Sequence, residues 1–387
     1  MESEKKLALS EIEGPRYLQK GRNMSKKIIT IVAFLAVILS AQTVSSVFGA
    51  EVQAPQPRSR SEVQAVLAKA PKPAKRDLRQ LDIVLVAFKK DHGLNEHDYP
   101  LWQKRWAVLL GGQEAGQEKQ VNLYGPAPKK QREKVLAGAP NVRVSTADGW
   151  PSKEQFKTAE LIVAFCYIQW DGQKMQELEE FLSRGGGFVL LHPAVIVPQG
   201  MDITDQLAKL IGLAWEYNYT RWRHGEVALK ITAQEHPICL GLPDTIHLLD
   251  EAYWPLKGDR SKVTVLATSD EAVSPAPSTG SGQALSQVEG KDSEQTKPEP
   301  MFYAYQSGPW HGLPARENTA KMAVPPSQDA AAGKGRVFSC ILGHYTWTFD
   351  DPYFRILLLR GMAWAAGESP YRFDQLVTRG ALIGKGR

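Results

Sequence analysis

The sequence predicts an α/β fold with a doubly wound, mostly parallel sheet. Three short and almost entirely apolar runs, beginning at Leu81, Leu161 and Gly187, have the composition of strands that are buried on both faces. Amphipathic segments separate such runs, and several of these segments stop at glycine, which commonly ends a helix. Strands that alternate with helices require right-handed crossovers, which build a parallel sheet with helices on both faces.

The predicted elements follow one another at short intervals along the chain. Strands are expected to begin near Leu81, Asn141, Leu161, Gly187, Val227, Val263 and Arg336. Helices are expected over residues 100–110, 171–184, 202–213 and 350–366. Proline near the start of the first and last of these helices, and glycine just beyond their ends, support these boundaries.

These elements predict one α/β domain over residues 81–370. We expect a leader over 1–50, a linker over 51–80 and a C-terminal tail over 371–387. Residues 271–300 are rich in Ser, Gly, Gln, Glu and Pro, so they cannot bury enough apolar surface to order themselves. We interpret them as a disordered insertion within the domain, because the sheet needs the strand near Arg336 on the far side.

Composition and charge narrow the class of protein. Of the 387 residues, 43% are hydrophobic and 23% charged, as in an ordinary globular protein with a sizeable core. The net charge of +5 comes from scattered basic residues, so the sequence predicts no nucleic-acid partner. The three cysteines lack metal-ligand spacing, and Cys166 and Cys340 lie in apolar runs. We therefore expect buried free thiols and no disulfide scaffold.

The leader predicts export. Lys26 and Lys27 precede an apolar stretch over residues 28–41, which is long enough for a signal peptide and short for a bilayer span. We place the signal peptide over about 24–50, with Met24 as an alternative start of the protein. The expected location is periplasmic or extracellular, with no membrane span after cleavage. A retained membrane anchor is the alternative.

Histidines follow three of the predicted buried strands. His92 and His97 lie in the loop after the first strand, His192 ends the strand that begins at Gly187, and His344 follows the last strand. Because ligands of doubly wound sheets bind at the carboxyl ends of the strands, we expect these segments to share one site. The alternative is that each histidine is structural. Imidazole both transfers protons and binds metals, so a metal-free acid/base site and a site with a divalent ion both fit.

Aromatic and charged residues also gather in two later segments. Residues 215–226 include Trp222, Arg223 and His224, and flat aromatic faces beside polar groups suit a sugar ring. Glu251 and Tyr253 follow in the second segment, where Glu251 is an acid/base candidate. The alternatives are that the aromatics only cover the edge of the sheet and that Glu251 is a structural surface carboxylate.

The ordered set KKDHG, GGGFVLLH, WRHGE, EHPICLGLP, DEAYWP and LGHYTWTFDDP resembles the ThuA-like family, which is named for trehalose utilisation. The resemblance covers roughly residues 81–370 and implies a flavodoxin-like fold of the class I glutamine amidotransferase-like superfamily and a role in carbohydrate metabolism. It assigns the site to His92, His192, Arg223, Glu251 and His344. Where amidotransferases carry their nucleophilic cysteine, this chain has His192, so glutaminase activity is not expected.

Two kinds of function remain open from the sequence. The first is an exported enzyme that acts on a glycoside or keto-sugar as an isomerase, lyase or hydrolase. In this hypothesis His92, His192, Glu251 and His344 are catalytic, and a divalent metal is an open alternative. The substrate is then bound by Trp222, Arg223, His224 and Tyr253. The second is a sugar-binding or scaffolding module without catalysis, and either could be a homo-oligomer.

Overall fold

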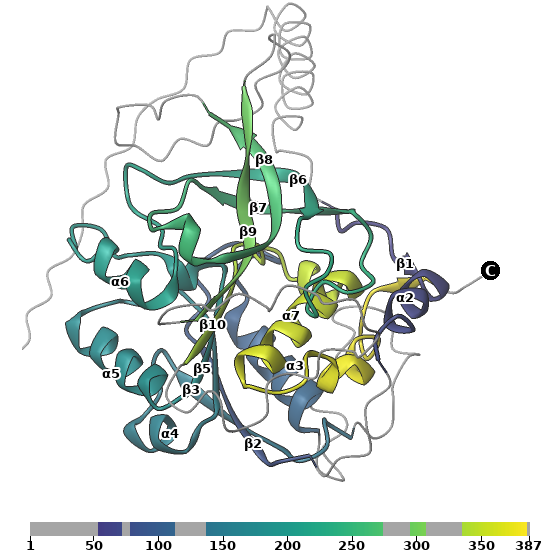
Figure 1. Cartoon of the computed structure of the whole chain (residues 1–387), viewed down its shortest axis with the longest axis horizontal. Helices are drawn as coiled ribbons and strands as arrows, with labels where there is room; N and C mark the ends of the chain where they lie inside the picture. Colours follow the sequence, from purple (N-terminus) through teal and green to yellow (C-terminus); the bar gives the residue numbers. More distant parts are fainter. Residues whose placement is uncertain (1–52, 72–77, 113–136, 274–294, 307–334, 385–387) are drawn as a thin grey trace, which may run out of the picture. The chain divides into compact units, whose positions relative to one another are not determined.

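The computed structural model describes residues 53–71, 78–112, 137–273, 295–306 and 335–384. Residues 54–387 form one compact unit. Within its described part, nine strands make a single mixed sheet, and two short strands form a second sheet. Figure 1 shows the large sheet with helices on both sides of its lower half.

Five parallel strands form one half of the large sheet. In spatial order they are β3 (Val142–Asp148), β2 (Leu81–Ala87), β4 (Leu161–Phe165), β5 (Gly187–Leu191) and β10 (Arg336–Cys340). Numbered along the chain, this is the order 2-1-3-4-5 of flavodoxin-like folds. The strands β4 and β5 are buried along their whole length, which explains their apolar composition. All five predicted strands of this half are present.

Four antiparallel strands form the other half, so the prediction of a mostly parallel sheet holds only in part. They continue from β10 in the order β9 (Thr296–Gln306), β8 (Thr264–Ala272), β6 (Arg221–Ile231) and β7 (Thr245–Trp254). Local sequence patterns predict β6 and β8 but neither β7 nor β9. Residues 232–244 join β6 to β7 without a helix, and the two strands therefore pair as antiparallel neighbours.

Helices cover both faces of the parallel half. Figure 1 shows α4 (Lys153–Thr158), α5 (Gly172–Ser183) and α6 (Thr204–Ile211) on one side, and α3 (Tyr99–Gly111) and α7 (Pro352–Ala365) on the other. The side chain of Asp351 caps α7 by accepting hydrogen bonds from the backbone N–H groups of Tyr353 and Phe354. Almost every residue of α7 is buried, which makes this helix a central part of the core.

The regions predicted as linker and tail take part in the fold. In the linker, β1 (Arg58–Ser59) and α2 (Arg60–Leu67) are ordered elements, and Val63 and Val66 are buried in the core. In the tail, the 3-10 helix η4 (Pro370–Leu376) packs on α7, and β11 (Ile383–Gly384) pairs with β1. The domain therefore extends beyond the boundaries of 81–370 that the sequence suggests.

Both ends of the predicted insertion over 271–300 belong to strands of the sheet. The strand β8 runs to Ala272 and β9 begins at Thr296, and each pairs with the other in the sheet. Residues 274–294 and the predicted signal peptide lie outside the described residues. Across the described ranges, no helix combines the length and the apolar character that a membrane crossing requires.

Packing of α7 on the sheet predicts the effect of a substitution. Gly361 lies where an added Cβ would overlap the ring of Phe338 on β10. We expect Gly361→Ala to lower the free energy of unfolding by about 1–3 kcal/mol, because overpacking forces a shift of the helix or the ring. Urea unfolding followed by circular dichroism measures this. In the control Gly172→Ala, the new Cβ meets no atom within 4 Å, and stability should not fall. Equal stability of both variants would contradict this packing.

Candidate active site

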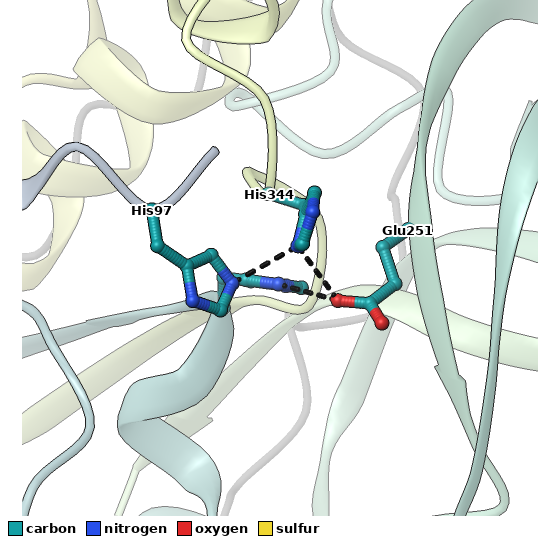
Figure 2. A group of neighbouring side chains, drawn as sticks. His97, Glu251 and His344 are labelled. Carbon is teal, nitrogen blue, oxygen red and sulfur yellow. Dashed lines mark hydrogen bonds and ion pairs between the residues drawn. The ribbon is translucent and has the colours of Figure 1, made fainter. Parts of the chain in front are cut away.

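Four buried side chains meet at the carboxyl ends of the parallel strands. His97 lies in the loop after β2, His192 begins the 3-10 helix η1 (His192–Val195) directly after β5, and His344 follows β10. Glu251 comes from β7, in the antiparallel half of the sheet. Their exposed fractions lie between 0% and 6%. Figure 2 shows His97, His344 and Glu251 pointing toward one another. We call these four residues the inner cluster.

Short contacts connect the members of the inner cluster. The Nδ1 atom of His344 lies 3.0 Å from Nε2 of His97 and 3.0 Å from Oε2 of Glu251. The Nε2 atom of His192 lies 3.0 Å from the same Oε2 atom. The Tyr253 hydroxyl also lies 3.0 Å from Nε2 of His192. One carboxylate oxygen therefore receives two imidazole contacts.

Groups outside the inner cluster bind the opposite nitrogens of two of these rings. The Nδ1 atom of His97 lies 3.0 Å from Oδ1 of Asp91, and Nδ1 of His192 lies 2.7 Å from the backbone oxygen of Ile341. Because carboxylate and carbonyl oxygens only accept hydrogen bonds, these contacts assign the ring proton to Nδ1 in both histidines. In its neutral form, each ring directs an Nε2 lone pair into the inner cluster.

The second oxygen of Glu251 points toward the surface. Its Oε1 atom lies 3.2 Å from Nε2 of His224, whose side chain is 41% exposed. His224 and Glu251 are cross-strand partners in β6 and β7, so the pairing of the two strands fixes this contact. Glu251 therefore connects a partly exposed imidazole to the buried histidines.

The surroundings set the charges of these groups. Burial by itself would raise the pKa of Glu251, but its contacts with His192, His224 and His344 outweigh burial and hold that pKa well below its usual range. Burial lowers the pKa of His97 to about 3, so this ring is neutral near neutral pH. The hydrogen bond to Glu251 raises the pKa of His224 above its ordinary value. Glu251 is thus an anion, and His224 is the imidazole beside it that solvent reaches.

Asp250 holds the loop that carries His344. Its Oδ1 atom accepts hydrogen bonds from the backbone N–H groups of His344, at 2.9 Å, and of Gly343, at 3.2 Å. It also accepts one from the N–H of Glu251, at 2.6 Å. Asp250 is fully buried, and these bonds tie the loop after β10 to β7. The position of His344 relative to Glu251 depends on them.

The structure places the other predicted site residues around the inner cluster. His92 is 44% exposed and bonds to Asp91, with its ring centre 3.8 Å from that of His97. The ring of Trp222 lies 5.3 Å from that of His224. Arg223 forms a bidentate ion pair with the buried Glu271, at 2.7 and 2.8 Å. Its guanidinium is therefore already held by a carboxylate of β8.

The sequence pattern alone assigns no role in the site to His97, Asp91 or Asp250. His92 and His97 stand in one loop, and the pattern of residue types does not show which imidazole turns inward. Positive φ angles at Asn95 (63°) and His97 (42°) fold this loop so that His97 enters the inner cluster. The Asp91 side chain between the two rings was the available signal, because a carboxylate beside a histidine commonly orients it.

The turn after β5 carries an imidazole in a strained backbone conformation. His192 has φ 49°, which is rare for residues other than glycine. The three cysteines of the chain are all buried free thiols, as expected, and burial raises the pKa of Cys166 to about 12. None of them offers an exposed thiolate for covalent catalysis.

A family model described as "ThuA: Trehalose utilisation" matches residues 116–365, which is more than half of the chain. The chain belongs to the ThuA family. The matched range includes His192, His224, Glu251 and His344. Asp91 and His97 precede it, so the loop after β2 that carries them lies outside the matched range.

Solved structures of similar shape include two described as putative ThuA-like proteins. One, from Parabacteroides merdae, is 16% identical with a TM-score of 0.43, and the match covers 75% of this chain and 91% of that one. The other, from Bacteroides uniformis, is 14% identical with a TM-score of 0.46, and the match covers 78% and 99%. The search of curated proteins found no match.

The bonds of Asp250 predict its contribution to stability. Asp250→Ala leaves three buried N–H groups without their acceptor, so we expect the free energy of unfolding to fall by about 2–4 kcal/mol. Asp250→Asn keeps an oxygen that can accept the same bonds, and its loss should be smaller. Urea unfolding of both variants measures the difference. Native-like stability of Asp250→Ala would show that these bonds do not hold the loop.

Proposed function

We propose that this ThuA-family protein catalyses a proton-transfer reaction on a carbohydrate, with His224 as the acid/base group that touches the substrate. The observation that carries the proposal is the contact between His224, which solvent reaches, and the buried carboxylate of Glu251, at 3.2 Å. A carboxylate beside an imidazole fixes its tautomer and stabilises its charged form. A module that only binds a sugar or serves as a scaffold does not need this pair.

The contacts of His224 determine which of its ring nitrogens can exchange a proton with a substrate. Its Nε2 atom is engaged with Oε1 of Glu251, so exchange with a substrate would use Nδ1. The hydrogen bond to Glu251 raises the pKa of His224 and so favours its charged form, which suits donation of a proton to a sugar oxygen or its return after abstraction. Glu251 is a positioning residue in this scheme, because it is 6% exposed and acts through His224.

Family and surface chemistry support a carbohydrate as the substrate. The ThuA family model is described by trehalose utilisation. Trp222 places a flat apolar ring 5.3 Å from the His224 ring, and aromatic faces of this kind stack on sugar rings. A glycoside or keto-sugar fits, and isomerisation, elimination and hydrolysis each need a proton donor and acceptor of this type. The export predicted from the leader would place the reaction outside the cytoplasm.

The substrate is expected to bind at the surface of the site, above the inner cluster. The cavity that borders His344 measures about 10 Å³, which is room for one water molecule and not for a sugar. Among the histidines of the site, those that a sugar could reach are His92 and His224, whose side chains are 44% and 41% exposed. His92 is thus a second candidate for direct contact with the substrate.

A screen of disaccharides and keto-disaccharides tests the proposal. We expect the native chain to convert at least one of them and His224→Asn to lower kcat/KM by about 100-fold or more, the usual contribution of a general acid or base. His247→Asn is the matched control, because His247 forms an exposed pair with Glu226 on the same β6–β7 hairpin, at 2.9 Å. The control should keep native turnover. Binding without turnover by the native chain would instead support a sugar-binding module.

A further inference from the structure

We propose that the inner cluster binds one divalent transition-metal ion of the Zn²⁺ class. The ligands would be Nε2 of His97, Nε2 of His192, Nδ1 of His344 and Oε2 of Glu251. The inference deepens the proposed function, on which it rests only for the chemical role of the ion. The binding site itself is argued from the geometry of these four side chains.

The distances fit a small tetrahedral site. One ligand atom from each of the four residues lies within 4.8 Å of all the others. Three of the pairs, His344 with His97, His344 with Glu251 and His192 with Glu251, are 3.0 Å apart. Bonds of about 2.0–2.1 Å from zinc to nitrogen or oxygen require ligand pairs about 3.3 Å apart. The three 3.0 Å pairs are already close to this spacing, and the other pairs, all within 4.8 Å, would close to it as the side chains gather around an ion.

Groups around the inner cluster bind the outer nitrogens of the histidine rings and so orient the inner nitrogens toward a metal ion. Asp91 binds the outer nitrogen of His97, and the Ile341 carbonyl binds the outer nitrogen of His192. On His344, the outer Nε2 atom lies 3.7 Å from Oε1 of Glu96, which is an ion-pair distance. Metal-binding histidines characteristically have a carboxylate or carbonyl at the nitrogen that does not bind the metal. His97 and His192 have one within hydrogen-bond distance, whereas Glu96 faces Nε2 of His344 at the longer distance of an ion pair.

Hydrogen-bond acceptors that face one another repel, so a positive charge between them would stabilise the inner cluster. In its neutral form, with the proton on Nδ1, His192 directs a lone pair at Oε2 of Glu251 across 3.0 Å. His97 directs a lone pair at Nδ1 of His344, which a proton on that nitrogen would satisfy in the metal-free site. The Tyr253 hydroxyl can donate to only one of these acceptors. A cation between the four atoms would accept all of these lone pairs at once.

The donor set selects the class of metal. Three imidazole nitrogens and one carboxylate oxygen suit Zn²⁺ and its first-row neighbours, whereas Mg²⁺ and Ca²⁺ prefer oxygen ligands throughout. The neighbouring group of Asp91, His92 and His97 makes no second site in this scheme. Its Asp91 and His92 side chains are 40% and 44% exposed, and Asp91 is already used to orient His97.

Metal binding can be measured without any substrate. The full chain is treated with EDTA, dialysed and titrated with ZnCl₂ against a chromophoric chelator, and the bound metal is counted by elemental analysis. We expect one Zn²⁺ per chain with a dissociation constant below about 1 µM, and no competition from millimolar Mg²⁺ or Ca²⁺. A native chain that binds no Zn²⁺ at 100 µM, or several ions equally well, would overturn the proposal.

Variants locate the ion. His97→Gln and His192→Gln should each weaken Zn²⁺ binding by at least 100-fold, and Asp91→Asn by about 10–100-fold through the orientation of His97. His247→Asn, with its exposed pair, should bind as the native chain does. Circular dichroism shows whether each variant is folded. Folded His97→Gln and His192→Gln that both bind Zn²⁺ like the native chain would contradict the assigned ligands.

The same samples separate the two proposals. If the metal-free chain binds no Zn²⁺ and still converts the sugar, while His224→Asn does not, the proposed function stands and the metal site is wrong. If Zn²⁺ binds as expected and the native chain converts no sugar in the screen, the metal site stands without the enzymatic function. His224→Asn should keep its Zn²⁺ in either case, because His224 contacts the other oxygen of Glu251.

Discussion

The site depends on where the ring protons of its buried histidines are held. Asp91 and the Ile341 carbonyl lie outside the inner cluster and bind Nδ1 of His97 and His192. In the neutral rings the opposite nitrogens face inward as acceptors, toward a carboxylate that is also an acceptor. Such an arrangement is stable only with a positive charge at its centre, whether that charge is a proton or a metal ion. The hydrogen bonds outside the inner cluster thus determine which nitrogen atoms inside it can bind a proton or a metal ion.

The mixed sheet is what brings a carboxylate to these histidines. The parallel half delivers three imidazoles to one edge, because its strands all end there. Glu251 cannot come from that half and is supplied by β7, the last strand of the antiparallel half, whose partner β6 carries His224. In Figure 1, β6 and β7 lie across the upper end of the parallel strands. Asp250 joins the two halves by binding the backbone of the His344 loop.

Local patterns in the sequence predict the parallel half well and the antiparallel half poorly. Buried parallel strands such as β4 and β5 are continuous apolar runs that stand out from the chain around them. By contrast, β7 contains adjacent acidic residues, Asp250 and Glu251, and β9 contains Pro298 and Pro300, so neither has the expected composition of a strand. The convergence of histidine-bearing loops follows from the topology. The choice of His97 over His92 depends on backbone angles that residue types do not determine.

The residue at the turn after β5 shows how this site differs from a nucleophilic one. His192 keeps a left-handed φ of 49°, a conformation that costs about 1–3 kcal/mol and must be held by its surroundings. A nucleophile at such a turn has to be exposed to its substrate, but His192 is fully buried, and both of its ring nitrogens have partners at 2.7–3.0 Å. The strained turn therefore aims an imidazole at a point inside the protein. In the proposed scheme such a residue holds a charge in place, and proton exchange with a substrate falls to the groups that solvent can reach.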